Sequence, residues 1–205
     1  MEINSEEIPF DVRYKLLTGT IVPRPIALVS TISPNGDCNL APFSYFNIVG
    51  HNPMALSFSV AGIKPNRSNK DTFTNIAAEE KSEFVINIVN EAIAVKMAKT
   101  ATVLDYGVCE FEYSGLTKEK SLTVKPYRVK ESPVSFECET FKIIEVGISK
   151  LIIGLVKHLY VSDELLEDNF RVNQSKLKAV GRMAGSSYCV STNLFTVDDE
   201  KFFPL

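Results

Sequence analysis

The chain has 205 residues, 45% of them apolar, a composition typical of a globular protein with a hydrophobic core. Its 22 basic and 25 acidic side chains give a net charge of −3, which argues against a nucleic-acid partner, because such proteins need a basic surface. No apolar run approaches the roughly 20 residues of a membrane helix, and the acidic start does not resemble a secretory signal. We therefore expect a cytoplasmic protein with no membrane partner, folded as one domain over residues 1–205 with its core in 8–195.

Most segments have the pattern of short β-strands separated by turn signals. Residues 26–33 (IALVSTIS) predict a buried strand, Asn35-Gly36 then favours a tight turn, and residues 38–41 return as the partner strand. Further strands are expected where residues alternate in polarity or form short apolar runs, at 56–60, 84–89, 134–144 and 150–161.

Helical patterns are fewer. Asp71 predicts an N-cap for a helix over 72–81, and residues 91–100 form a second expected helix. Shorter helices are expected at 164–168 and 173–180. Many strands with a few inserted helices indicate a mainly β fold, a closed or nearly closed antiparallel barrel.

The cysteines, at positions 38, 109, 138 and 189, form no C-x-x-C pair. Their spacing predicts neither a zinc site nor a disulfide framework, so we expect reduced thiols, with Cys138 as a small core side chain. The sequence also lacks the glycine-rich dinucleotide motif, the P-loop, the G-x-S-x-G elbow and H-E-x-x-H. His51 and His158 have no evident partner in sequence, and we expect structural or surface roles for them.

A first candidate site is the run from Asn39 to Asn47, NLAPFSYFN. Pro42 has no backbone N–H, so we expect strand pairing to break there and to expose backbone groups to a ligand. Ser44 and Asn47 add side-chain donors and Phe43 adds apolar area, the mixture that a planar heterocycle needs. The alternative is a bulged strand whose aromatic residues fill the core.

A second candidate is the basic loop 64–72, which lies directly before the expected helix. Free N–H groups at a helix start favour an anion, and Thr72 with Lys70 or Arg67 could add a hydroxyl and a charge. Asp71 would repel a phosphate, so its expected role is to cap the helix. The alternative is a solvated basic loop.

A third candidate is Gly181-Arg182-Met183-Ala184-Gly185. The two glycines permit close backbone approach, and Arg182 offers a contact for an anion or a carbonyl group. The alternative is an ordinary C-terminal turn.

Taken together, these pieces resemble the flavin reductase-like, FMN-binding split-barrel family, with flavoredoxin-like proteins as the most similar subgroup. The resemblance rests on the order and spacing of short pieces across almost the whole chain. The pieces include residues 17–31 (LTGTIVPRPIALVST), 39–47 (NLAPFSYFN), 56–59 (LSFS), 70–76 (KDTFTNI), 83–87 (EFVIN) and 181–182 (GR).

The resemblance implies a six-stranded antiparallel Greek-key split β-barrel that forms a homodimer, with FMN rather than FAD at the subunit interface. It also implies a set of cofactor contacts, and residues 183–187 depart from the family pattern, so the substrate side is not defined. The implied flavin-binding residues are Arg24, Thr31, Asn39, Leu40, Ala41, Pro42, Phe43, Ser44 and Asn47, with Ser57, Phe58 and Ser59 beside the flavin, Lys70, Asp71 and Thr72 at the phosphate end, and Gly181, Arg182 and Tyr188 closing the site.

The implied activity is hydride transfer from NADH or NADPH to the flavin, followed by electron delivery to a protein or small-molecule acceptor. Such chemistry is carried by the flavin, so no catalytic side chain or metal is required. One alternative is an electron carrier without nicotinamide-dependent activity. A remote alternative is a non-enzymatic β-barrel that uses aromatic residues to stack bases.

Overall fold

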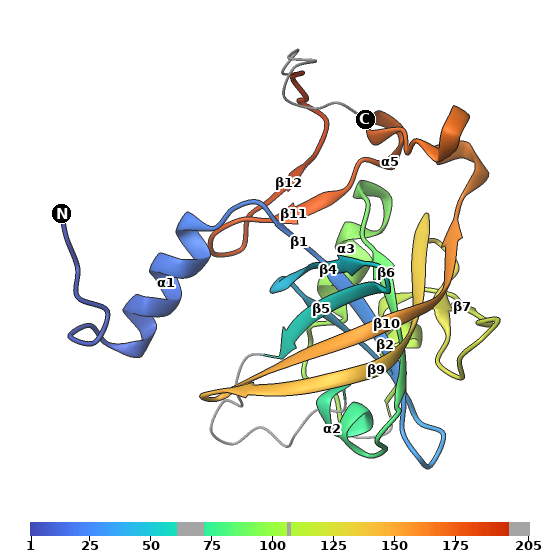
Figure 1. Cartoon of the computed structure of the whole chain (residues 1–205), viewed down its shortest axis with the longest axis horizontal. Helices are drawn as coiled ribbons and strands as arrows, with labels where there is room; N and C mark the ends of the chain where they lie inside the picture. Colours follow the sequence, from blue (N-terminus) through green and yellow to red (C-terminus); the bar gives the residue numbers. More distant parts are fainter. Residues whose placement is uncertain (61–71, 106–107, 197–205) are drawn as a thin grey trace.

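The protein is built around a seven-stranded antiparallel sheet (Figure 1), seen in a computed structural model that describes residues 1–60, 72–105 and 108–196. The strands lie in the order β3-β2-β6-β9-β10-β5-β4. Their bounds are β2 (Ala27–Ile32), β3 (Cys38–Phe43), β4 (Phe46–His51), β5 (Met54–Val60), β6 (Glu83–Ile88), β9 (Val134–Val146) and β10 (Ser149–Val161). The expected mainly β, antiparallel split-barrel class is confirmed, with seven strands in the main sheet where six were expected.

Helices and two smaller sheets surround this sheet. The helices are α1 (Phe10–Thr20), α2 (Thr72–Ala77), α3 (Ala94–Lys99), α4 (Glu110–Ser114) and α5 (Gln174–Leu177), with 3-10 turns η1 (Glu91–Ile93), η2 (Asp163–Leu165) and η3 (Asp168–Phe170). One small sheet has the order β1-β11-β12, from β1 (Arg24–Pro25), β11 (Val180–Arg182) and β12 (Tyr188–Val190). The other pairs β7 (Lys118–Glu119) with β8 (Arg128–Val129).

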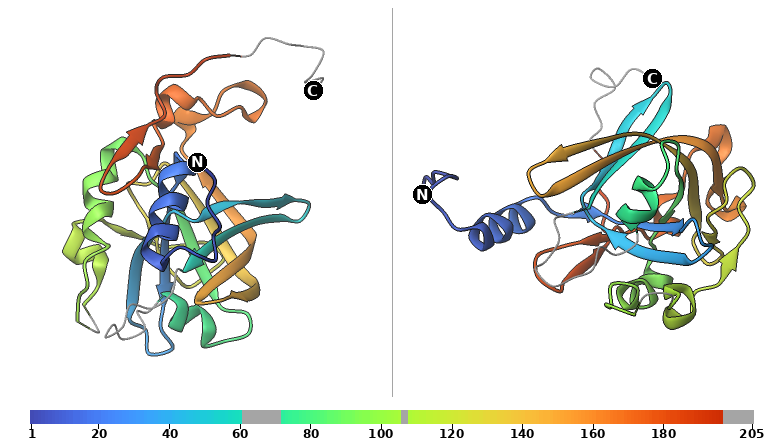
Figure 2. Two further views of the ribbon diagram at one scale, coloured as in Figure 1. Left: turned by 90° about the vertical axis from the view of Figure 1, so that its left-hand side faces the viewer. Right: turned by 90° about the horizontal axis from the view of Figure 1, so that it is seen from below.

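The main sheet curls so that its two edges approach each other, as two further views show (Figure 2). Near the curled edges β3 contacts β5, and the Ser59 amide donates to the Tyr45 carbonyl at 2.8 Å. Alternate side chains of the strands fill the interior, where Phe58 and Phe84 are fully buried. Gly154 is required in β10, because a Cβ there would lie 2.3 Å from the Phe84 ring.

A second core lies on the outer face of β2 and β3. Leu28 and Leu40 point to this face and pack in one cluster with Met97 of α3 and Phe111 of α4. The short helices α3 and α4 therefore cover one face of the barrel wall, while α2 contributes Ile76 to the interior.

The expected strands are confirmed to within a few residues, and β4 adds a strand that was not expected. The helix predicted over 72–81 ends at Ala77. The helix predicted over 91–100 begins as a 3-10 turn, where the Asn90 side chain accepts a hydrogen bond from the Ile93 amide. Both α1 and α4 were missed.

The expectation of reduced cysteines throughout is wrong. Cys38 at the start of β3 and Cys109, the N-cap of α4, form a disulfide across 71 residues. No local spacing motif signals this pair, because only the packing of α4 on β3 brings the two residues together. Cys138 is fully buried in β9, as expected, and Cys189 of β12 is a free, half-buried thiol.

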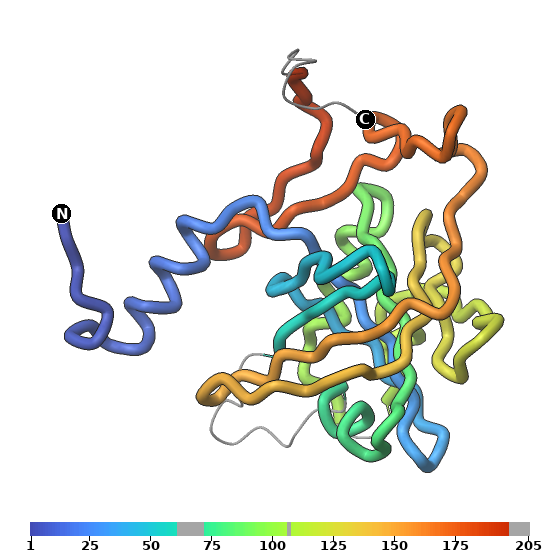
Figure 3. The backbone as a smooth tube through the Cα atoms, in the orientation of Figure 1, coloured from blue at the N-terminus to red at the C-terminus, as the bar shows by residue number. Residues whose placement is uncertain are grey.

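Helix α1 projects from the body, and the chain path shows that β1 and the β11–β12 hairpin lie side by side next to it (Figures 1 and 3). Several large apolar side chains of α1 are exposed, among them Phe10 at 68% and Leu17 at 54%. Its inner contact is made by Thr18, which is buried. The described part of the protein thus leaves most of this helix uncovered.

Candidate functional site

Many of the residues predicted to bind the flavin lie on the edge strand β3 or contact it. The Leu40 amide donates to the Glu110 carboxylate at 3.1 Å, so this residue turns its backbone groups away from the neighbouring strand β2. Pro42 lies two residues further along the strand, so its backbone groups also point away from β2. The N–H that proline lacks would therefore not have bonded to β2. Pairing continues through Leu28–Pro42 to Ala27–Phe43, so the expected break at Pro42 is wrong. The carbonyl groups of Leu40 and Pro42 face the free edge instead.

At one end of β3, Arg24 joins three segments that are distant in sequence. Its guanidinium is buried and donates to the carbonyls of Thr18 at 2.6 Å and Ile21 at 2.9 Å, both at the end of α1. It also donates to the Ser44 hydroxyl at 3.3 Å and to the Met183 carbonyl at 3.1 Å. These bonds go to the chain itself, so in this structure Arg24 positions Ser44.

Gly181, Arg182 and Tyr188 lie beside Arg24. In the register of β1 with β11, Arg24 pairs with Arg182 and Pro25 pairs with Gly181. The Arg182 guanidinium lies 4.5 Å from the ring centroid of Tyr188 and donates to the Gly185 carbonyl. The structure therefore brings the third sequence candidate to the same place as Arg24 and Ser44.

The residues of β4 and β5 that were predicted to line the flavin differ in burial: some side chains lie in the core, and others lie at least partly at the surface. Phe58 is fully buried, with its ring centroid 5.0 Å from that of Phe43, so its side chain belongs to the core. For these rings the interpretation as core packing is correct. Asn47 is exposed, lies opposite Ser57 in the register and accepts from the Ile48 amide at 2.8 Å. Ser59 is half-buried on the same strand as Ser57.

At the other end of β3, four buried polar side chains form a cluster, which we call the Asn39 cluster: Thr31, Asn39, Thr72 and Asn75. The Asn39 amide nitrogen donates to the Thr72 hydroxyl at 2.7 Å and to the Thr31 hydroxyl at 3.3 Å. The Asn75 amide nitrogen donates to the Thr31 hydroxyl at 2.9 Å. Because each hydroxyl oxygen accepts from an amide, its own hydrogen is directed away and can be donated to another acceptor.

The side-chain oxygen of Asn39 is unusual because it is a buried polar atom without a hydrogen-bond partner among the described residues. The whole residue is only 3% exposed. An unpaired buried polar atom costs about 1–3 kcal/mol, so such atoms are commonly matched by a ligand or by water. Asn75 was not expected in this cluster, although its place three residues after Thr72 puts both on one helix face. Lys70 and Asp71, predicted at this end, lie outside the described residues.

The two polar groups thus border one strand edge. Five residue steps separate Asn39 from Ser44, which corresponds to about 17 Å in an extended strand. Ala41 and Leu40 lie between them, with Leu40 fully buried in the outer core. The arrangement suits an elongated ligand that has polar groups at both ends.

Tyr45 follows Ser44 and adds a neutral phenol to the site. Burial raises the pKa of Tyr45, and the nearby Tyr14 raises it further, while Arg24 opposes both effects. The side chain therefore remains an O–H donor over the physiological pH range. The histidines lie elsewhere: His51 is exposed on β4, and His158 Nδ1 is 3.7 Å from the Glu137 carboxylate.

Comparison with known proteins shows the family of the chain. Residues 18–180 match the family described as "Flavin reductase like domain". A protein of Aquifex aeolicus (strain VF5) is 42% identical over 188 residues, covering 92% of this chain and 94% of that protein.

Solved structures also resemble the chain. Nitrilotriacetate monooxygenase component B from Bacillus cereus superposes with a TM-score of 0.90 at 34% identity, covering 96% of this chain and 98% of that one. The 2-nitrobenzoate 2-nitroreductase NbaA of Pseudomonas fluorescens gives 0.87 at 30% identity, covering 100% and 99%. The flavoredoxin of Desulfovibrio vulgaris (Miyazaki F) gives 0.75 at 19% identity, covering 89% and 94%, and so shows a shared fold alone.

Among the described residues, no helix combines the length and the apolar character needed to cross a bilayer.

Proposed function

Because the chain belongs to the flavin reductase-like domain family, we propose that it binds FMN along the free edge of β3 and works as an NAD(P)H-dependent oxidoreductase. The observation that carries this proposal is the buried Asn39 cluster, with its unpaired oxygen and its two orientable hydroxyls at one end of that edge. Bound FMN would supply hydride acceptance and electron transfer, and the residues of this chain would hold and orient it.

The donor set of the Asn39 cluster fits the tail of FMN. The Thr31 and Thr72 hydroxyls can donate to phosphate or ribityl oxygens, and the Asn39 oxygen can accept from a ribityl hydroxyl. A buried hydroxyl or amide that is matched by a ligand group contributes about 1 kcal/mol or more to binding, because the alternative is an unpaired polar atom. The resemblance also implies a role for Lys70, which lies outside the described residues, as a charge that would complement the phosphate.

The opposite end of β3 suits a flat ring. The Pro42 carbonyl, in the second half of β3, faces the free edge and can accept a hydrogen bond from the single ring N–H of oxidised FMN, while Ser44 and Tyr45 offer hydroxyls. Arg24 holds the Ser44 hydroxyl in place through its own contacts to α1 and to Met183. A fixed polar edge against apolar surface is what a planar heterocycle requires.

A homodimer is part of this proposal. The exposed apolar residues Phe10, Tyr14, Leu17 and Ile21 follow at spacings of four, three and four, which places them on one stripe of α1 and its C-cap. An isolated 11-residue helix is marginal in water, so a covering surface would stabilise it. Since Arg24 bonds to the end of α1, a second copy covering this stripe would lie beside the ring end of the site.

Sedimentation velocity tests this surface. Phe10→Glu with Leu17→Glu is expected to shift the protein from dimer to monomer, whereas Lys15→Gln, on another part of the same helix, leaves the dimer intact. A monomer in the unmodified protein, or a dimer in the double variant, would rule out the α1 stripe as the interface.

The tail contacts are tested by titrating the protein with FMN and following flavin fluorescence. Thr72→Val keeps the side-chain shape and removes one hydroxyl, so the affinity is expected to fall about fivefold to tenfold. Thr102→Val, an exposed position in a loop after α3, is the matched control and should bind FMN like the unmodified protein. Equal affinity in all three proteins would place the tail elsewhere.

The reductase activity is tested by anaerobic stopped-flow mixing of the FMN-loaded protein with NADH and with NADPH. Loss of the flavin absorbance band with either nucleotide is the expected result. A flavin that stays oxidised with both would favour the electron-carrier alternative.

The acceptor can be tested in the same apparatus. Two proteins of similar structure are a nitroreductase and a monooxygenase component, so the acceptor classes to compare are a nitroaromatic compound and a second, protein component. Reoxidation of the reduced flavin by 2-nitrobenzoate would favour the first class.

A further inference from the structure

The Cys38–Cys109 disulfide attaches α4 to the strand that borders the proposed flavin site. Cys38 is the first residue of β3, and Cys109 caps α4. The next contact between the same two segments is the bond from the Leu40 amide to the Glu110 carboxylate. Both a disulfide and a hydrogen bond therefore join β3 to α4.

Asn39 lies between the two attached residues of β3. Successive strand residues point to opposite faces, so Cys38 and Leu40 face α4 while Asn39 faces the Asn39 cluster. A change in how β3 is held against α4 must therefore reach Asn39 through the strand backbone, and with it the bonds to Thr31 and Thr72.

We propose that the Cys38–Cys109 disulfide is a reversible modification site, exchanged by dithiols, and that its reduction weakens FMN binding at the Asn39 cluster. This inference rests on the proposed function. A disulfide in a protein expected to be cytoplasmic is itself informative, because disulfides in reducing compartments are commonly transient or redox-sensing.

The two cysteines differ in exposure as residues. Cys38 is half-buried, whereas Cys109 is only 8% exposed, so the proposed attack is at Cys38. A thiolate of the dithiol attacks Cys38 Sγ, the bond between the sulfurs breaks, and Cys109 leaves as a thiolate that takes up a proton. The second thiol of the reagent then attacks the mixed disulfide and releases Cys38. Two electrons and two protons pass from the dithiol to the protein, and the reagent becomes a disulfide.

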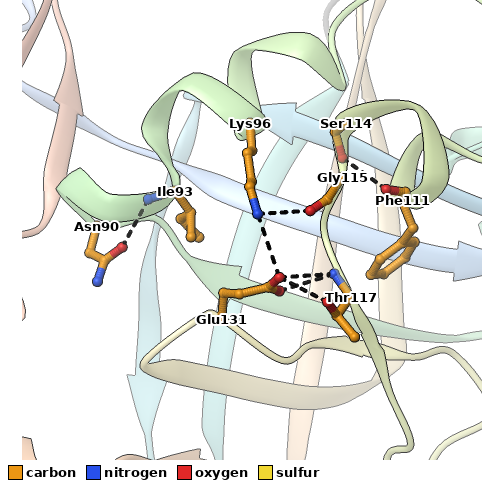
Figure 4. A network of polar contacts seen from close by, with 8 residues as sticks. All are labelled: Asn90, Ile93, Lys96, Phe111, Ser114, Gly115, Thr117 and Glu131. Atoms are coloured by element: carbon orange, nitrogen blue, oxygen red, sulfur yellow. Dashed lines mark hydrogen bonds and ion pairs between the residues drawn. The ribbon is translucent and has the colours of Figure 1, made fainter.

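A polar network would keep α4 attached after reduction (Figure 4). Lys96 of α3 donates to the Gly115 carbonyl, just after α4, at 2.8 Å and lies 3.8 Å from the Glu131 carboxylate. The same carboxylate accepts from the Thr117 amide and hydroxyl. Since this network holds the far end of α4, the change on reduction is confined to the end that carries Cys109, and the barrel itself stays folded.

The test compares FMN affinity before and after reduction. Oxidised protein, and protein treated with dithiothreitol and then freed of reagent under anaerobic conditions, are titrated with FMN. Alkylation in denaturant, followed by intact mass, should count two free thiols in the first sample and four in the second, because Cys138 is buried in the folded protein and reacts only after unfolding. The expected loss of affinity is about fivefold or more, the lower range of typical coupling between sites. Reoxidation should restore it.

Two variants sharpen the test. Cys38→Ser with Cys109→Ser should bind FMN like the reduced protein and should not respond to the dithiol. Cys189→Ser keeps the disulfide and should respond like the unmodified protein. Equal affinity of both redox forms, or a disulfide that resists the dithiol in the folded protein, would overturn the inference and leave the proposed function standing. Absence of FMN binding in both forms would overturn the proposed function, and this inference with it.

Discussion

Substitution of Gly181 by alanine tests how tightly β11 is packed on the segment that carries Arg24. The added Cβ would lie 2.6 Å from Pro23 Cβ and 3.1 Å from Cys189 Sγ. Carbon atoms in contact are normally about 3.5–4.0 Å apart, so β11 and Pro23 must separate by roughly 1 Å. The proline ring cannot rotate away, and overpacking of this kind costs about 1–3 kcal/mol.

The shift would also move Arg24, which follows Pro23 and donates to Met183 at 3.1 Å. We therefore expect Gly181→Ala to lower both the free energy of unfolding, measured by urea denaturation, and the affinity for FMN. Gly19→Ala is the matched control, because its Cβ meets nothing within 4 Å and alanine favours a helix. Equal stability and equal FMN affinity in the two variants would refute the packing argument.

Two further predictions concern stability. The disulfide closes a loop of 71 residues, so Cys38→Ser with Cys109→Ser is expected to lower the free energy of unfolding by about 4 kcal/mol; a loss below about 1 kcal/mol would contradict this. Burial raises the pKa of Glu137, but hydrogen bonds from the Thr123 hydroxyl and from the Leu122 and Thr123 amides outweigh it, so the folded pKa lies below the usual value. The stabilisation by the ionised Glu137 carboxylate is complete above the unfolded pKa and is lost as the pH falls through the folded pKa. Between about pH 6 and about pH 3, the free energy of unfolding of Glu137→Gln, measured by urea denaturation, should therefore fall less than that of the unmodified protein. If the two free energies of unfolding fell in parallel with pH, the assignment would be contradicted.

The barrel strands could be predicted because their signal is local. Alternation in residues 134–144 and the apolar run before Asn35-Gly36 identify strands without tertiary information. Strand β4 was not expected, and the break expected at Pro42 is absent because the position of its missing N–H lies on the unpaired side of an edge strand. Whether the backbone groups of a residue point toward a paired strand or toward a free edge depends on the order of strands in the sheet. The periodicity of the sequence does not give this order.

Some of the residues that the resemblance implies for the site lie together, namely Arg24, Ser44, Gly181 and Arg182, although Arg24 bonds to the chain itself. Their contacts to a flavin stay a prediction. The disulfide and α1 could not be predicted in this way. The disulfide depends on contact between segments far apart in sequence, and α1 exposes the apolar residues that a helix within one globular domain would bury.

The most direct test of the account is a crystal structure of the protein with FMN. The account predicts the flavin along the free edge of β3, with its phosphate tail against Thr31, Asn39, Thr72 and Asn75 and its ring toward Ser44. A flavin bound away from β3, or a site at Asn39 left without flavin under saturating FMN, would contradict it.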